Sequence, residues 1–303
     1  MTGKGEIAGK IKGDIAEKIG TLAEALPYIR RYRGKTIVVK YGGNAMIRPP
    51  LQRAFARDVA LLKLVGVNPV VVHGGGPQIN LTLERMGLKS RFVEGMRYTD
   101  DETMDIVEMV LGGLVNQKIV QMINDAGARA VGLTGKDGGL LRARRMKVKS
   151  GGGEVDVGLV GEVEKVDAAV LSLLDGADFI PVVAPVGADG AGGALNVNAD
   201  WAAAHIAAAL GAEALLLLTN TPGVLDEKEK PVAELTAARA RALIENGAIR
   251  GGMKPKTECA LFAVSRGVAS CRIINGAARH ALLLEMFTDA GAGTRIASPE
   301  MSP

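Results

Sequence analysis

Residues 36–46, which read TIVVKYGGNAM, decide the fold of this chain. The β-branched run predicts a buried strand that ends at Lys40, and Gly42 and Gly43 follow it in a turn. Taken alone, a lysine at the end of a strand is more often simply solvated. The paired glycines favour a phosphate site, because bare backbone can approach an anion closely.

On the C-terminal side of this stretch, apolar runs alternate with helical patterns. Further strands are expected near residues 68–73, 128–135, 178–186, 214–219 and 271–276, and helices near 51–65, 99–125, 236–246 and 254–267. The helix over 99–125 opens with a capping box, in which Thr99 is the expected N-cap and Glu102 follows three residues later. Residues 140–166 alternate apolar and polar side chains and predict antiparallel hairpins. Continuous apolar strands joined through helices predict an α/β fold with a mostly parallel sheet covered on both faces.

The composition excludes several classes of protein. Aromatic residues make up 3% of the 303 residues, which leaves few platforms for stacking nucleic-acid bases. The net charge of +4 is carried by residues 1–35, where eight basic residues face four acidic ones, so the body of the chain is neutral. We therefore expect no nucleic-acid partner. The apolar runs, such as 214–219, are too short to span a bilayer, so no membrane is expected.

The cysteines and the N-terminus indicate where the protein works. The two cysteines, Cys259 and Cys271, have neither metal-ligand spacing nor a disulfide framework, which is typical of the reducing cytoplasm. The N-terminus lacks the apolar stretch of a secretory signal. Cytoplasmic localisation is expected.

Residues 1–35 are expected to form an amphipathic helical arm ahead of the first strand. Five apolar residues recur at helical spacing, namely Ile15, Ile19, Leu22, Leu26 and Ile29. Pro27 interrupts this pattern and is expected to kink the helix. The apolar stripe can be buried on its own domain or on a neighbouring subunit, and the pattern favours neither.

A second glycine turn follows the strand at 68–73, in the stretch HGGGP at 73–77. It fails the dinucleotide fingerprint, because the third glycine would fall on Ile79, and GKT at 34–36 fails the Walker A pattern, which needs a glycine where Ile29 stands. One glycine would be enough for a tight turn. Three in a row, opening a helix, favour a bound carboxylate or phosphate.

Two further stretches suggest polar or anionic ligands. NVNAD at 196–200 ends in Asp200, which either caps the following helix or binds a ligand or cation together with its neighbours. In GGMKPK at 251–256, Lys254 and Lys256 stand at a helix N-terminus, where the helix dipole disfavours cations unless an anion binds. A snorkelling surface lysine is the alternative. The three histidines at 73, 205 and 280 are scattered, so no protein metal site is expected.

These stretches together resemble the amino acid kinase family. The matching segments, in order, are IVVKYGGNAM, VVVHGGGPQIN, EGMRYTD, GLTGKDGG, VGLVGEV, NVNAD, LLLLTNTPGVL and GGMKPK. The resemblance runs from about Leu22 to Ile296 and implies an open, mostly parallel sheet sandwiched between helices, in two lobes. Residues 36–190 would bind N-acetyl-L-glutamate and residues 191–303 would bind ATP, after the arm at 1–35.

The resemblance also implies roles for single residues. Lys40 and Lys256 would stabilise the transferring phosphoryl group, and Asp200 would organise them. Acetylglutamate would be bound by Gly75, Gly76, Arg97 and Asn196, and the phosphates and nucleotide by Gly42, Gly43, Thr219, Asn220 and Gly223. Mg²⁺ would arrive on the nucleotide phosphates. A carboxylate acceptor is already ionised at neutral pH, so no general base is required.

Regulation and assembly follow from the same resemblance. The arm looks like that of an arginine-inhibited branch, with Tyr28, Glu285 and Gly291 at the arginine-binding positions. In that branch the arm links dimers into a hexamer, so we expect a homo-oligomer, either hexamer or dimer. Two positions depart from the family pattern: Asn220 replaces a common aspartate, and Trp201 stands where small residues are usual.

Three other readings compete with this one. A related kinase acts on carrier-linked aminoadipate in lysine biosynthesis and shares most of these motifs. A non-catalytic amino-acid sensor would keep the fold, but it would be expected to lose one of the lysines or Asp200, and all three are present. Nucleic-acid binding by the basic arm is explained equally well by a solvated or interface helix.

Overall fold

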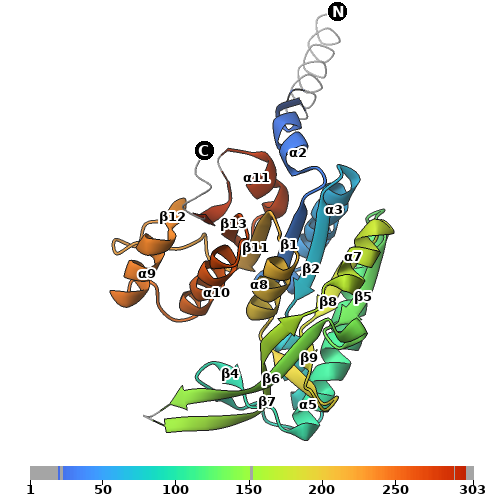
Figure 1. The fold of residues 1–303 in the computed structure, drawn as a ribbon, viewed down its shortest axis with the longest axis vertical. Helices are drawn as coiled ribbons and strands as arrows, with labels where there is room; N and C mark the ends of the chain where they lie inside the picture. The colour runs from blue at the N-terminus through green and yellow to red at the C-terminus, as the bar shows by residue number, and fades with distance from the viewer. Residues whose placement is uncertain (1–19, 21–22, 151–152, 290, 298–303) are drawn as a thin grey trace, which may run out of the picture.

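The computed structural model describes residue 20 and residues 23–150, 153–289 and 291–297. An eight-stranded sheet forms its centre, in the order β12-β14-β13-β11-β1-β2-β8-β5 (Figure 1). The strands are β1 (Thr36–Tyr41), β2 (Asn68–His73), β5 (Ala130–Thr134), β8 (Ile180–Ala184), β11 (Ala214–Thr219), β12 (Glu234–Thr236), β13 (Ser270–Asn275) and β14 (Gly293–Ala297). All neighbours are parallel except β13 and β14. The expected mostly parallel sheet is confirmed, and the stretch at 36–46 supplies its middle strand.

Helices cover both faces of the sheet. They are α2 (Leu26–Tyr32), α3 (Pro49–Leu64), α4 (Gly76–Arg85), α5 (Asp101–Glu108), α6 (Asn116–Asp125), α7 (Ala169–Gly176), α8 (Ala199–Ala209), α9 (Ala237–Glu245), α10 (Met253–Ser265) and α11 (Ala281–Phe287). Alternate residues of β1 enter two separate cores. Val39 packs with residues of α3, α4, α6 and α11, whereas Val38 packs with residues of α7, α8, α9 and α10. Both side chains are fully buried, which fixes the register of β1.

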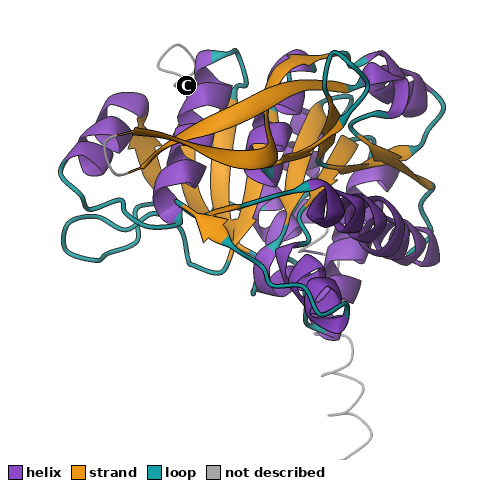
Figure 2. Cartoon of the chain, turned by 90° about the horizontal axis from the view of Figure 1, so that it is seen from below, coloured by secondary structure: helices purple, strands orange, loops and turns teal. Residues whose placement is uncertain are grey.

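A smaller β-structure lies beyond the central sheet. It is a closed barrel of β6 (Leu141–Ser150), β7 (Gly153–Val166), β9 (Val186–Ala188) and β10 (Ala194–Val197). Figure 2 shows the long ribbons of β6 and β7 crossing in front of the central sheet. The expected antiparallel hairpin is therefore confirmed. A short hairpin of β3 (Phe92–Val93) and β4 (Met96–Arg97) lies close to β7.

The N-cap expected at Thr99 is wrong by one residue. Helix α5 is capped by Asp100, whose carboxylate accepts a hydrogen bond of 2.9 Å from the Thr103 backbone N–H. The Thr99 N–H donates instead to the Val157 carbonyl, and the Thr99 carbonyl accepts from Leu159. Because β7 uses the backbone of Thr99, the helix begins after it. The helical segment ends at Asp125 as expected, but its middle, Met109–Val115, is a π-helical turn (η2).

The described part of the arm is residue 20 and residues 23–35. Residues 23 and 24 are helical, Ala25 is a turn, and α2 begins at Leu26 with Pro27 in its first turn. The helical pattern is therefore interrupted next to Pro27, as expected, and the proline stands where a missing backbone N–H is tolerated. Ile15, Ile19 and Leu22 lie outside the described residues. Asp101–Asp125 is, among the described residues, the helical segment long and apolar enough to cross a membrane. Its Ile106, Ile119 and Ile123 are buried in the core, so this is weak evidence for a membrane.

Candidate active site

Two lysines and one aspartate meet at the centre of the molecule. Lys40 lies near the end of β1, Asp200 in the first turn of α8 and Lys256 in the first turn of α10. The Lys40 Nζ lies 3.0 Å from Asp200 Oδ1, and the Lys256 Nζ donates to Asp200 Oδ2 at 2.5 Å. One carboxylate therefore bridges two ammonium groups that lie 216 positions apart in the chain.

The charges of this triad control each other. Burial alone would raise the pKa of Asp200, but Lys40 and Lys256 outweigh it and lower that pKa to about 2. Burial lowers the pKa of Lys40, and Asp200 opposes this effect. With Asp200 ionised and both lysines protonated, the triad carries one net positive charge. A buried group with this surplus favours an anionic ligand.

Gly42 and Gly43 leave room for their neighbours. A Cβ at Gly42 would lie 2.5 Å from the Lys40 Nζ, so a larger residue there would displace the ammonium group from its place against the turn. Gly43 has φ +67°, and a Cβ there would lie 2.5 Å from Asn220 Oδ1. The structure therefore brings the glycine turn, Lys40 and Asn220 together, as the sequence predicted for a phosphate site.

A cavity of about 530 Å³ contains the four residues predicted to bind acetylglutamate, Gly75, Gly76, Arg97 and Asn196. Arg97 donates to the Gly76 carbonyl at 3.3 Å and also to the Ser90 hydroxyl. Burial lowers the pKa of Arg97. The apolar wall is made by Phe92, Met96, Leu111, Met146 and Val160. A guanidinium beside open glycine backbone and an apolar wall suits a small amphipathic anion.

The triad borders this cavity without lining it. Ala199 and Pro255, the residues before Asp200 and Lys256, are among the lining residues, but Lys40, Asp200 and Lys256 are not. Trp201 also lines the cavity and packs edge-on against Phe262, with ring centroids 5.5 Å apart. The unusual tryptophan thus forms part of the cavity wall on the side of α8 and α10.

The nucleotide-side residues are only partly brought together. Thr219 ends β11, and its carbonyl accepts from the Gly276 N–H at 2.8 Å. Gly223 has φ +142°, and a Cβ there would lie 2.6 Å from Thr294 Oγ1. Gly223 lines a second cavity of about 570 Å³, together with Thr221 and a segment at 246–250. Thr219 and Asn220 do not line it.

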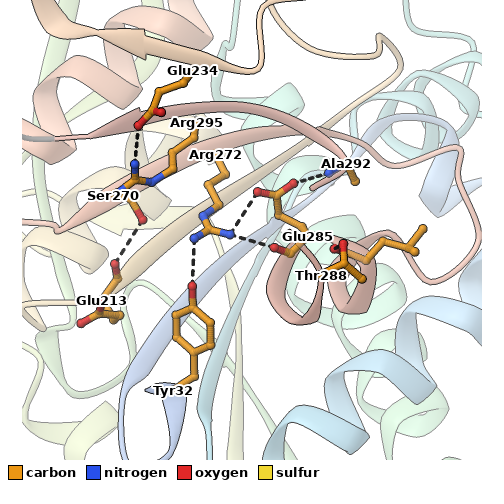
Figure 3. Close-up of polar contacts among 10 residues, drawn as sticks. Tyr32, Glu213, Glu234, Ser270, Arg272, Glu285, Thr288, Ala292 and Arg295 are labelled. Carbon is orange, nitrogen blue, oxygen red and sulfur yellow. Dashed lines mark hydrogen bonds and ion pairs between the residues drawn. The ribbon is translucent and has the colours of Figure 1, made fainter. Parts of the chain in front are cut away.

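The residues predicted for arginine lie near α11, which contacts α2, α3 and β13. Glu285 is buried; its carboxylate accepts from Arg272 at 3.1 Å and from the Ala292 backbone N–H (Figure 3). Gly291 has φ +62°, and a Cβ there would lie 3.1 Å from Glu285 Oε2. Tyr28 donates to Asp289 at 2.5 Å. The three predicted residues therefore lie close to the end of α11, where they contact Asp289, Ala292 or each other.

Sequence reasoning missed several residues that support the site. Asn198, not Asp200, caps α8: its side chain accepts from the Asp200 backbone N–H at 2.9 Å. This leaves the Asp200 carboxylate directed at the lysines, so the alternative that Asp200 is only a cap is wrong. His73 contacts the Gly74 carbonyl of the glycine loop, and Asn116 contacts His73. Only His73 carried a signal, its place next to three glycines.

The profile of the amino acid kinase family matches residues 35–275. The acetylglutamate kinase of Chromobacterium violaceum is 58% identical over 284 residues, covering 93% of this chain and 98% of the relative. That of Halorhodospira halophila is 59% identical over 281 residues, covering 91% of this chain and 94% of the relative.

Solved structures of a more distant protein share the fold. N-acetylglutamate synthase from Neisseria gonorrhoeae, complexed with coenzyme A and N-acetyl-glutamate, has a TM-score of 0.80 at 28% identity over 92% of this chain. Its complex with coenzyme A and L-arginine has a TM-score of 0.77, also at 28% identity over 92% of this chain. The chain spans 63% and 65% of those synthase chains. By sequence and by fold, the chain belongs to the amino acid kinase family and groups with its acetylglutamate kinases.

Proposed function

We propose that this protein transfers the γ-phosphoryl group of ATP to the γ-carboxylate of N-acetyl-L-glutamate. The products are ADP and N-acetylglutamyl 5-phosphate, in the biosynthesis of arginine. The observation that carries the proposal is the bridge of Lys40 and Lys256 through Asp200, beside a cavity that holds Arg97. The relatives at 58% and 59% identity, which are named acetylglutamate kinases, support the choice of substrate.

The chemistry needs positive charge more than it needs a base. A γ-carboxylate with a pKa of about 4 is ionised at neutral pH and can attack phosphorus directly. The obstacle is repulsion between this anion and the phosphates. Lys40 and Lys256 offset that repulsion and stabilise the charge on the transferring group, while Asp200 holds both ammonium groups in place.

Substrate binding is assigned to the first cavity. Arg97 forms an ion pair with the α-carboxylate, and the backbone of Gly75 and Gly76 receives a second oxygen-bearing group of acetylglutamate. Asn196, whose amide donates to Thr99 Oγ1 at 3.2 Å, presents its carbonyl oxygen to the acetamido N–H. The apolar wall takes the acetyl methyl group.

ATP is assigned to the other side of the triad. Its phosphates are placed at the turn of Gly42 and Gly43, beside Asn220, and its nucleoside in the second cavity, past Thr219 and Gly223. No group of three or more His, Cys, Asp or Glu residues that could hold a metal occurs among the described residues. In this proposal Mg²⁺ therefore arrives on the nucleotide phosphates, which suits an ion that keeps few protein ligands.

An ATP-dependent hydroxamate assay tests the proposal. Hydroxylamine traps an acyl phosphate as a coloured hydroxamate, so the signal reports phosphorylation of a carboxylate. We expect signal with N-acetyl-L-glutamate, and none with glutamate or without ATP. Faster turnover of an aminoadipate substrate would favour the lysine-pathway kinase instead, and absence of signal with every carboxylate would overturn the kinase assignment.

We further propose that arginine inhibits the enzyme, in a cytoplasmic homo-oligomer. Arginine would bind between α2 and α11, at Tyr28, Glu285 and the loop that contains Gly291. A related synthase was solved with L-arginine, which supports an arginine site on this fold. The exposed Leu26 of α2 supports a further subunit contact, and the buried free cysteines suit a reducing compartment. The same assay with and without arginine tests the inhibition.

A further inference from the structure

His73 directly precedes the glycine loop of the first cavity. It is the last residue of β2 and is fully buried. Its Nδ1 lies 2.9 Å from the Gly74 carbonyl oxygen, and its Nε2 lies 3.1 Å from the Asn116 side-chain amide nitrogen. The mechanism proposed above gives this histidine no chemical step, so its two contacts need another explanation.

Asn116 determines which nitrogen of His73 carries the proton. The Asn116 amide nitrogen also lies 2.8 Å from the Val182 carbonyl and 3.3 Å from the Leu133 carbonyl. Carbonyl oxygens only accept, so the amide group, and not the side-chain oxygen, must point toward them and toward His73. The amide has two hydrogens, and its two shorter contacts, to the Val182 carbonyl and to His73 Nε2, use them. His73 Nε2 is then an acceptor, and the proton of the neutral ring is on Nδ1. His73 therefore donates to the Gly74 carbonyl.

Gly74 is held from both sides as a result. Its carbonyl accepts from His73, and its N–H donates to the Tyr41 carbonyl at 2.9 Å, between Lys40 and the turn at Gly42. Gly75 and Gly76, which line the cavity, follow immediately. The orientation of Gly74 therefore fixes where the backbone of the anion-binding loop begins, relative to the lysine turn.

The neighbouring strand leaves space for the Asn116 side chain. A Cβ at Gly132 of β5 would lie 1.9 Å from Asn116 Oδ1, so this strand carries a glycine where the amide enters. That oxygen is buried and has no hydrogen-bond partner among the described residues. An apolar side chain would fill the same space without leaving a polar atom unpaired. The buried amide therefore costs stability compared with an apolar side chain. Its presence is explained by the orientation that it imposes on His73.

We infer that Asn116 is a positioning residue: it fixes the tautomer of His73, which orients Gly74 and so places the Gly75–Gly76 backbone that receives acetylglutamate. The inference rests on the proposed function for the identity of the ligand. It predicts that loss of the relay weakens acetylglutamate binding while leaving the lysine triad and ATP binding largely intact.

The test compares variants that keep or remove single steps of the relay. Asn116→Leu removes the amide, and His73→Gln keeps an acceptor for Asn116 but removes the donor to Gly74. His73→Asn can keep that donor. Ile123→Val, buried in the same helix, is the control for lost stability. The readouts are kcat, the KM for each substrate, the acetylglutamate Kd by calorimetry, and Tm.

We expect Asn116→Leu and His73→Gln to raise the KM and Kd for acetylglutamate by about tenfold, which corresponds to one lost binding contact. Their kcat and KM for ATP should change by less than about threefold, and His73→Asn should recover most of the loss. Ile123→Val should lower Tm without changing KM.

If both Asn116→Leu and His73→Gln keep an acetylglutamate Kd within about twofold of the parent and lower only Tm, the role of Asn116 is overturned and the proposed function stands. If Asn116→Leu does not fold, the two His73 variants still decide, because equal acetylglutamate Kd values in His73→Asn and His73→Gln contradict it. A parent that neither binds nor phosphorylates acetylglutamate would overturn the proposed function and this inference together.

Discussion

At the scale of single residues, the site depends on one carboxylate that serves two cations. Two lysines left alone at this distance would repel each other, and burial would favour their neutral forms. Asp200 keeps the pair charged and close, at the expense of being buried itself. Removing Asp200 would therefore damage both lysines, whereas removing one lysine leaves the other paired with it.

Lys256 and Lys254 offer a matched test of the triad. Both stand in the first turn of α10, but Lys256 contacts Asp200 whereas Lys254 is exposed. We expect Lys256→Ala to lower kcat by about 100-fold, as for loss of a group that stabilises charge in the transition state. Lys254→Ala should stay within about twofold, as a surface change. The hydroxamate assay measures both, and equal effects of the two variants would refute the role of Lys256.

His73 makes the stability of the protein sensitive to acid. Burial lowers its pKa to about 4, whereas a histidine in the unfolded chain titrates near 6.5. Between these values the unfolded chain binds more protons than the folded one, so stability falls as pH drops from about 6.5 toward 4. Above this window the contribution of the neutral ring is fully present.

We expect His73 to account for about 2 kcal/mol of the loss in unfolding free energy between pH 7 and pH 5. Urea denaturation of the parent and of His73→Gln at both pH values measures it, and the variant should lose less on acidification. Comparing the two proteins cancels other titrating groups, such as Asp58, whose pKa burial raises to about 6. The same pH dependence in both proteins would contradict the assignment.

The sequence identified the residues that carry charge or bare backbone, but it missed those that orient them. Lys40, Asp200 and Lys256 stand in short motifs whose composition suggests an anion. Asn116 stands 43 positions from His73 in an ordinary helical pattern, and nothing local marks it. Its role arises only where β2, β5 and β8 converge, so tertiary structure was needed to find it.

At the scale of elements, the lysines and Asp200 are presented by the beginnings of helices and the end of a strand. Parallel strands direct their carboxyl ends, and the following helix N-termini, to the same edge of a sheet. Helix α8 starts at this edge because Asn198 caps it, and the cap is the residue that places Asp200. The start of α8 thus has both a structural and a functional effect.

Variants of two helix caps separate the effect of a cap on stability from its effect on catalysis. Asn198→Ala should cost about 1 kcal/mol of unfolding free energy. It should also lower kcat by about fivefold, because Asp200 loses its fixed backbone. In the parent, the Thr236 hydroxyl caps α9 by accepting from the Arg239 N–H at 3.2 Å. Thr236→Ala removes this cap and should cost a similar free energy of unfolding, with kcat unchanged. Unchanged kcat in Asn198→Ala would mean that α8 holds Asp200 without its cap.

Element types were predictable, whereas element ends depended on contacts across the chain. The five further strands named from apolar runs are present, as is the β6–β7 hairpin. The start of α5 was misplaced because β7 uses the backbone of Thr99, which a capping pattern does not reveal. The π-helical turn at Met109–Val115 sits beside the glycine loop, where Leu111 approaches Gly75. The helical spacing of apolar residues in the sequence does not indicate a π-helical turn.

At the scale of the whole molecule, β1 divides the sheet into two sides, each with its own cavity, which we propose bind different ligands. The cavity with Arg97 lies on the side of β2, β8 and β5, and the second cavity on the side of β11, β13, β14 and β12. The triad joins the two sides, because Lys40 comes from β1 and the other members come from α8 and α10. The lobe boundaries at 36–190 and 191–303 stay a prediction, since one continuous sheet crosses them.

The N-terminal arm connects the proposed assembly with the proposed regulation by arginine. Helix α2 contacts α11, and Tyr28 donates to Asp289, which follows α11. The Tyr32 hydroxyl oxygen accepts a hydrogen bond from Arg272, the partner of Glu285 (Figure 3). Leu26 of the same helix is 54% exposed and is free to pack on another subunit. One helix thus reaches both the proposed arginine site and a candidate subunit contact.

Deletion of residues 1–33, which removes all of α2, should therefore lower the mass of the proposed homo-oligomer and weaken inhibition by arginine. The kcat without arginine should stay within about twofold, since the deletion leaves the triad and both cavities intact. Light scattering after size exclusion measures the mass, and the hydroxamate assay measures inhibition. Tyr28→Phe is the matched control: it removes only the hydroxyl that contacts Asp289, so it should weaken inhibition without changing the mass. A deleted chain with the parent's mass and the parent's inhibition would show that the arm has neither role.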